Sequence, residues 1–116
     1  INKILSLFLL DELHAPDVFK DIFINGKHSP LWTRVFGENM NKEQCKLYLQ
    51  PLKTYKVEKI FVGHTPQIED GINSICNEQI WRTDVGTSKA FDEFKTKETI
   101  QVLEIKYDNN IKIINI

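Results

Sequence analysis

The histidine at position 64 is the residue most able to do chemistry, and it stands within the sequence Ile60–Gln67, IFVGHTPQ. The apolar run before it predicts the end of a buried strand, and the Thr-Pro after it cannot continue a regular element. Gly63 would supply a sharp turn or a close approach to a ligand. His64 would then lie at the carboxyl end of a strand, where open α/β sheets bind ligands.

Two roles for His64 fit this local pattern equally well. An imidazole at this position is a candidate metal ligand or acid–base group. The alternative is a structural histidine that caps the strand and bonds a neighbouring carbonyl. The eight residues do not decide between these two roles.

The elements that position His64 predict an αβ unit. A helix is expected from 41 to about 53, because Asn41 and Gln44 form a capping box and apolar residues follow at helical spacing. Pro51 should kink or end its last turn. A short polar link then leads to a strand from 57 to 62. A helix followed by a strand in this way is an αβ unit, which predicts the α/β class.

Elements are also predicted on both sides of this unit. We expect a well-buried core helix over 1–13, a short helix from Asp17 to about 22, and a turn at 25–26. Trp32 and Phe36 should anchor an irregular segment to the core. A short strand is expected at 79–83, then a hairpin of 99–107 and 111–116 turning at 108–110. Apolar residues on both faces of 99–107 predict an inner strand packed on both sides.

Composition narrows the classes of function. The 116 residues allow one domain at most, and a net charge of −1 without a basic run argues against nucleic-acid binding. The apolar run 4–10 is too short to span a membrane. Cys45 and Cys76 lack Cys-x-x-Cys spacing, so two buried, reduced thiols and an intracellular, cytoplasmic location are expected, with a disulfide as the alternative.

Further blocks surround the histidine motif. Ser29–Arg34 precedes it with SPLWTR, and Asp70–Asn77 and Ile80–Phe91 follow with DGINSICN and IWRTDVGTSKAF. In this order and spacing, the blocks resemble the C-terminal half of calcineurin-like metallophosphoesterases, most closely the bacterial-like branch of the phosphoprotein phosphatases. The resemblance covers about residues 29 to 91.

The resemblance implies phosphoester hydrolysis at a centre of two divalent metal ions, which manganese, iron or zinc would fit. It implies that His64 ligates one metal, that Arg34 binds the substrate phosphate, and that Asp84 to Ser88 form a loop at the rim. Asp84 could orient His64, contact metal or hold a turn, and the turn is the favoured role. Ser88 has no matched base, so we reject a serine nucleophile.

The motifs that supply most metal ligands in this family are not found. Neither Gly-Asp nor Asn-His occurs in the chain, and Pro66 stands where the wider superfamily often has a second histidine. His14 and His28 match no family ligand, although His28 could line the site. Residues 1–116 are therefore expected to be the C-terminal portion of a four-layer αββα sandwich, inactive and poorly soluble alone.

Other functions remain open within and outside this family. The leading expectation is a serine/threonine-type phosphatase whose partner is a phosphorylated protein substrate, with no membrane partner. A dinucleoside polyphosphate hydrolase of the same fold is the alternative, because rim loops set the substrate. A non-catalytic phosphate-binding or scaffold remnant is the third possibility. The sequence predicts no oligomeric state.

Overall fold

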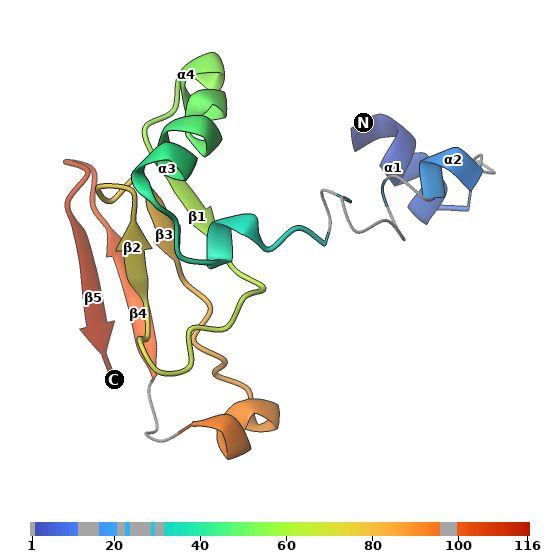
Figure 1. Cartoon of the computed structure of the whole chain (residues 1–116). Coiled ribbons are helices and arrows are strands. Elements are labelled where there is room, and N and C mark those ends of the chain that lie inside the picture. The colour runs from blue at the N-terminus through green and yellow to red at the C-terminus, as the bar shows by residue number, and fades with distance from the viewer. Residues whose placement is uncertain (1, 12–16, 21–22, 24–28, 30–31, 96–99) are drawn as a thin grey trace. The chain divides into compact units, whose positions relative to one another are not determined.

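The computed structural model describes residues 2–11, 17–20, 23, 29, 32–95 and 100–116 (Figure 1). The chain divides into two compact units, Ile1–Thr33 and Arg34–Ile116. His14, His28 and the predicted turn at 25–26 lie outside the described residues.

The first unit contains α1 (Asn2–Leu9) and α2 (Asp17–Lys20). The helix predicted to reach residue 13 ends at Leu9, because Asp11 adopts a left-handed backbone with φ 58°. The prediction that this helix is well buried is wrong at its C-terminal end, where Leu9 is 73% exposed. Trp32 is 54% exposed, so its predicted anchoring role is also wrong.

The second unit begins with three short helices: η2 (Val35–Gly37), α3 (Lys42–Tyr48) and α4 (Gln50–Tyr55). The predicted capping box is confirmed, because the Asn41 side chain accepts from the Gln44 amide and the Gln44 side chain accepts from the Asn41 amide. Pro51 breaks the predicted single helix and lies in the first turn of α4, a position that needs no amide donor. Phe36 contacts Tyr48 edge-on, as expected of an anchoring residue.

A mixed three-stranded sheet follows, in the order β1-β3-β2. β1 (Ile60–Val62) is parallel to β3 (Ile80–Arg82), and β2 (Asn73–Ile75) is antiparallel to β3. β1 starts later than predicted, because Lys56 is left-handed and the Val57 amide still bonds the Leu52 carbonyl of α4. The α/β class is confirmed, while the four-layer sandwich stays a prediction.

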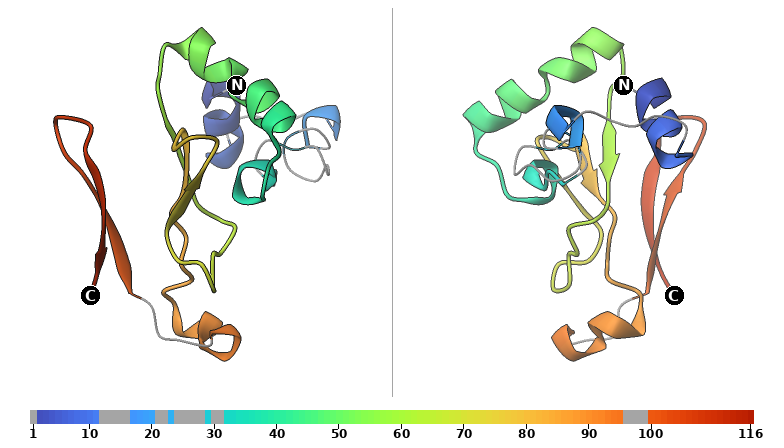
Figure 2. Two further views of the ribbon diagram at one scale, coloured as in Figure 1. Left: turned by 60° about the vertical axis from the view of Figure 1, so that its left-hand side comes forward. Right: turned by 90° about the vertical axis from the view of Figure 1, so that its right-hand side faces the viewer.

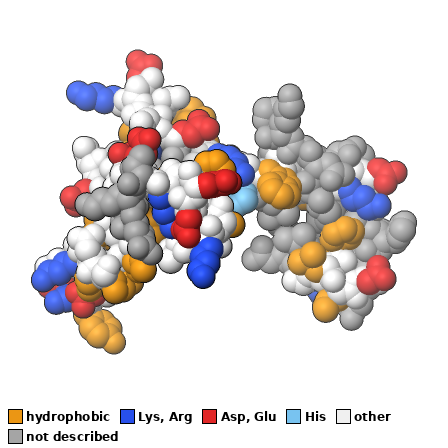
Figure 3. Space-filling model, turned by 90° about the horizontal axis from the view of Figure 1, so that it is seen from below, with side chains coloured by type: hydrophobic (Ala, Val, Ile, Leu, Met, Phe, Trp, Pro, Cys, Tyr) orange, Lys and Arg blue, Asp and Glu red, His pale blue; other side chains and the backbone are white. Residues whose placement is uncertain are grey.

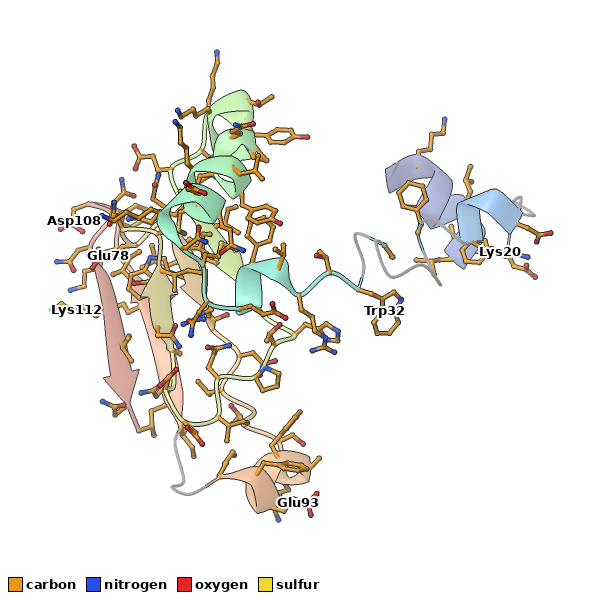
Figure 4. All side chains as sticks on the ribbon, viewed as in Figure 1. Lys20, Trp32, Glu78, Glu93, Asp108 and Lys112 are labelled. Atoms are coloured by element: carbon orange, nitrogen blue, oxygen red, sulfur yellow. A yellow bond between two sulfur atoms is a disulfide. The ribbon has the colours of Figure 1, made fainter. Side chains whose placement is uncertain are left out.

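A second sheet is the predicted hairpin of β4 (Gln101–Ile105) and β5 (Ile111–Asn115). Its turn is confirmed: Asp108, labelled in Figure 4, accepts a bond from the Asn110 amide, and Asn109 has φ 60°. One hairpin face packs through Leu103 and Ile111 on a core of three buried residues, namely Ile72, Trp81 and Val85. Figure 2 shows the hairpin on one side of the three-stranded sheet and α3 and α4 on the other.

The other hairpin face is uncovered within the described part of the chain. Val102 and Ile114 are paired across the strands and are 46% and 43% exposed. Within the described residues β4 pairs only with β5 and buries only one face, so packing on the other face stays a prediction.

The two cysteines form a disulfide that joins α3 to the end of β2. Cys45 and Cys76 are bonded with an S–S distance of 2.02 Å, so the prediction of reduced thiols is wrong. The expectation of an intracellular location loses the support it drew from those thiols. Within the described residues, no helix has the length and apolar character needed to cross a membrane.

Candidate active site

Arg34 and His64 meet in the second unit. Nη1 of Arg34 donates a hydrogen bond of 2.7 Å to the His64 carbonyl. Its Nη2 lies 3.4 Å from Nε2 of the imidazole. Both side chains are exposed; Figure 3 shows a pale blue histidine at the surface, and His64 is the only histidine among the described residues. The residues proposed to bind phosphate and metal therefore lie side by side, although they come from separate motifs.

The backbone at His64 turns sharply directly after β1. His64 has φ 66°, in the left-handed region that costs a residue other than glycine on the order of 1–2 kcal/mol. We expected Gly63 to provide the turn, but the residue with the left-handed backbone is His64. The bond from Arg34 to the His64 carbonyl helps to hold this conformation. A strained backbone beside a polar pair is common at functional sites.

The contact between the two side chains constrains the protonation of the imidazole. A guanidinium only donates hydrogen bonds. A bond between Nη2 of Arg34 and Nε2 of His64 therefore requires Nε2 to accept, with any proton of a neutral ring on Nδ1. The electron pair of Nε2 is then engaged by the Arg34 guanidinium, and a ligand at Nε2 would replace that contact.

The described residues do not fit a metal ion by themselves. No cluster of three or more His, Cys, Asp or Glu side chains suited to a metal occurs within the ranges that the structure describes. Catalytic metal sites usually draw three or more protein ligands, and His64 supplies one. The two predicted divalent ions thus require further ligands and stay a proposal.

Asp84 and Ser88 both make structural contacts. Oδ1 of Asp84 accepts from the Gly86 amide at 3.0 Å, which confirms the predicted turn. A Cβ atom placed on Gly63 would lie 4.0 Å from the Asp84 Cβ, so Asp84 flanks the residue before His64. Ser88 caps η3 (Lys89–Phe94) by accepting from the Ala90 amide. Their roles at a substrate rim stay a prediction.

A buried polar network next to the site was not predicted. Arg82 and Gln67 are only 6% and 9% exposed, and both donate to the Gly37 carbonyl at 3.2 Å. Gly37 belongs to the segment that begins with Arg34, and Gln67 to the loop that begins with His64. A charged residue ending the apolar strand Ile80–Arg82 was the available signal in the sequence.

Relatives of this chain include a protein phosphatase. The chain is 35% identical to Shewanella-like protein phosphatase 2 of Arabidopsis thaliana over 94 residues, which cover 79% of the chain and 23% of that protein. This similarity indicates a relationship to a phosphatase. No family model and no solved structure matches the chain.

Two uncharacterized proteins are also similar. A protein of Acanthamoeba polyphaga mimivirus is 37% identical over 131 aligned residues, covering 98% of the chain and 52% of that protein. A protein of Schizosaccharomyces pombe is 33% identical over 91 residues, covering 78% of the chain and 26% of that protein. The chain thus spans about half the length of the mimivirus protein and about a quarter of the Arabidopsis and Schizosaccharomyces proteins.

Proposed function

We propose that this chain is the C-terminal part of a metal-dependent phosphoester hydrolase, a serine/threonine-type phosphoprotein phosphatase of the calcineurin-like superfamily. The observation that carries the proposal is the direct contact of Arg34 with His64. The partial similarity to a named protein phosphatase supports it independently. The substrate would be a phosphorylated protein.

Arg34 has the chemistry needed to bind the phosphate. Its planar guanidinium can offer two parallel N–H groups to two phosphate oxygens. The bonds that it makes to His64 lie on an exposed side chain, so an arriving phosphate can replace them without burying an unpaired group. The phosphate would then be held beside the imidazole.

His64 has the chemistry of a metal ligand at the same place. A neutral imidazole suits manganese, iron and zinc, and we propose that the remaining ligands come from residues beyond this chain. A two-metal centre, when bound, activates water and neutralises phosphate charge. Asp84 would keep the neighbouring turn in place through its bond to the Gly86 amide.

The uncovered hairpin face supports the proposed sandwich architecture. Apolar side chains on this face are exposed, including Val102 and Ile114. Two sheets that pack face to face bury such side chains between them. We propose that a second sheet from the rest of the protein covers them, which agrees with the greater length of the relatives.

A substrate panel tests this proposal on the full-length gene product. The protein would be assayed with manganese against phosphoserine and phosphothreonine peptides and against dinucleoside polyphosphates, each with and without a chelator. Chelator-sensitive release of phosphate from the peptides is expected. Hydrolysis confined to the dinucleotides would contradict the substrate class, and no hydrolysis of either would favour a non-catalytic remnant.

A further inference from the structure

We infer that Arg82 is a positioning residue, which holds the Arg34 segment against the His64 loop without touching a substrate. The inference rests on the proposed function of Arg34 and His64. Arg82 is the last residue of β3 and is 6% exposed. Its guanidinium bonds Oδ1 of Asn73, the Gly37 carbonyl and Oδ1 of Asn39, at 2.6, 3.2 and 3.0 Å.

All three acceptors of Arg82 are neutral. The ion pairs within the described ranges are those of Lys20, Lys95 and Lys106, and none includes Arg82. Burying a cation without a carboxylate is costly, so its three hydrogen bonds must offset the loss of hydration. The guanidinium therefore serves a geometric purpose that an apolar residue could not, namely joining β3 to β2 and to the segment that contains Gly37 and Asn39.

Arg82 bonds the Arg34 segment directly, and Gln67 connects the same network to the His64 loop. The Gly37 carbonyl accepts from both Arg82 and Nε2 of Gln67. Gln67 also donates to the Thr65 carbonyl at 2.8 Å, directly after His64. Asn73 closes the network, because it accepts from Arg82 and donates to Oε1 of Gln67 at 3.2 Å. The network fixes both the segment of Arg34 and the loop of His64.

Close packing between the Arg34 segment and the His64 loop also fixes these two segments against each other. Gly37 lies so near Thr65 that a Cβ atom at position 37 would overlap the threonine side chain. The backbone of η2, which begins directly after Arg34, is thus in contact with the residue that follows His64. The buried hydrogen bonds hold this contact, and loosening them would let Arg34 move away from the imidazole.

A double-mutant cycle in the full-length protein separates positioning from general stability. The inhibition constant of inorganic phosphate would be measured for wild type, Arg34→Ala, Arg82→Met and the double variant. In the wild-type background Arg82→Met should raise this constant about tenfold, a coupling usual within one hydrogen-bonded network. In the Arg34→Ala background it should change less than about twofold. If Arg82→Met raised the inhibition constant by the same factor in both backgrounds, the inference would be overturned.

Two further variants are measured: one is a control for removing a basic side chain, and the other tests the planar fork of Arg82. Lys53→Met removes an exposed basic side chain from α4 and should leave the inhibition constant unchanged. Arg82→Lys keeps the charge but cannot bond three acceptors with a planar fork. Its inhibition constant should therefore lie between those of wild type and Arg82→Met. An Arg82→Lys protein that is fully folded and binds phosphate like wild type would contradict the role of the fork.

An NMR measurement decides the question without turnover. Contacts between the Arg34 guanidinium and the His64 ring should be detectable as nuclear Overhauser effects in wild type and Lys53→Met. They should be lost in Arg82→Met, while the remaining amide spectrum is retained. Contacts that persist in folded Arg82→Met would overturn the inference. A wild-type protein without phosphatase activity would instead contradict the proposed function, and this comparison would still test Arg82.

Discussion

Arg34 and His64 are 30 residues apart in the chain, yet the Arg34 guanidinium donates a 2.7 Å hydrogen bond to the His64 carbonyl. The same guanidinium lies 3.4 Å from Nε2 of the imidazole. Arg34 and His64 were predicted as site residues from separate motifs, and their contact brings the two motifs together in space. A guanidinium fork can bind phosphate with two parallel hydrogen bonds, as the proposed role of Arg34 requires.

Replacing Arg34 by alanine in the full-length protein should weaken catalysis and leave the metal content unchanged. We expect kcat/KM for a phosphoester to fall by about 100- to 1,000-fold, the effect of removing one preorganised donor to a charged transition state. Steady-state kinetics and elemental analysis measure the two quantities. Arg34→Lys should recover only part of the loss, because a point charge does not reproduce two parallel bonds. Wild-type kinetics in Arg34→Ala would remove this residue from the site.

The disulfide should make a large contribution to stability. Cys45 and Cys76 are separated by 31 residues, and a loop of that length corresponds to about 3–4 kcal/mol in the chain-entropy model. Urea unfolding of wild type, with and without dithiothreitol, and of the Cys45→Ser, Cys76→Ser double variant would measure this difference. Reduced wild type should match the double variant. Two free thiols in protein purified without reductant would contradict the disulfide.

The exposed hairpin face should limit the solubility of the isolated chain. Val102→Thr combined with Ile114→Thr keeps two β-branched residues on paired strand positions but reduces their apolar surface. The concentration at which the chain begins to aggregate, measured by light scattering, should rise several-fold. Leu103→Thr is the matched control on the core-facing side, and it should lower stability instead. Equal aggregation of wild type and the double variant would contradict this role for the face.

The isolated 116-residue chain should have no appreciable phosphatase activity. Its described residues contain no cluster of side chains able to hold a metal ion, and a lone imidazole does not hold a divalent ion tightly against water. Hydrolysis of p-nitrophenyl phosphate with added manganese measures this directly. Robust, metal-dependent turnover that is lost in His64→Ala would refute the proposal that ligands beyond this chain are required.

Local sequence signals predicted the regular elements best where one short segment contained the whole signal. The capping box at Asn41 and the Asx turn at Asp108 each depend on residues a few positions apart, and both are present. The strand β2 (Asn73–Ile75) was missed because it has a single apolar residue and low strand propensity. Its conformation comes from pairing with β3, a tertiary interaction that no local pattern encodes.

The candidate site was predicted only in its exposed members. Arg34 and His64 carry motif signals, whereas Gln67 and Arg82 look like ordinary polar residues until burial is known. The disulfide was predicted only as the alternative for a similar reason, since Cys45 and Cys76 meet only when α3 lies beside the end of β2. The left-handed turn at His64 was assigned to Gly63, because propensity alone favours glycine there.

The most direct test is the metal content and turnover of the full-length protein with His64→Ala. If His64 is a metal ligand at a phosphatase centre, this variant should lose bound metal. Its turnover should fall by more than about 100-fold, the upper end of the loss for a merely supporting residue. Glu69→Ala, an exposed change on the same loop, is the matched control. Wild-type turnover and an undiminished metal content in folded His64→Ala would contradict the proposed active site.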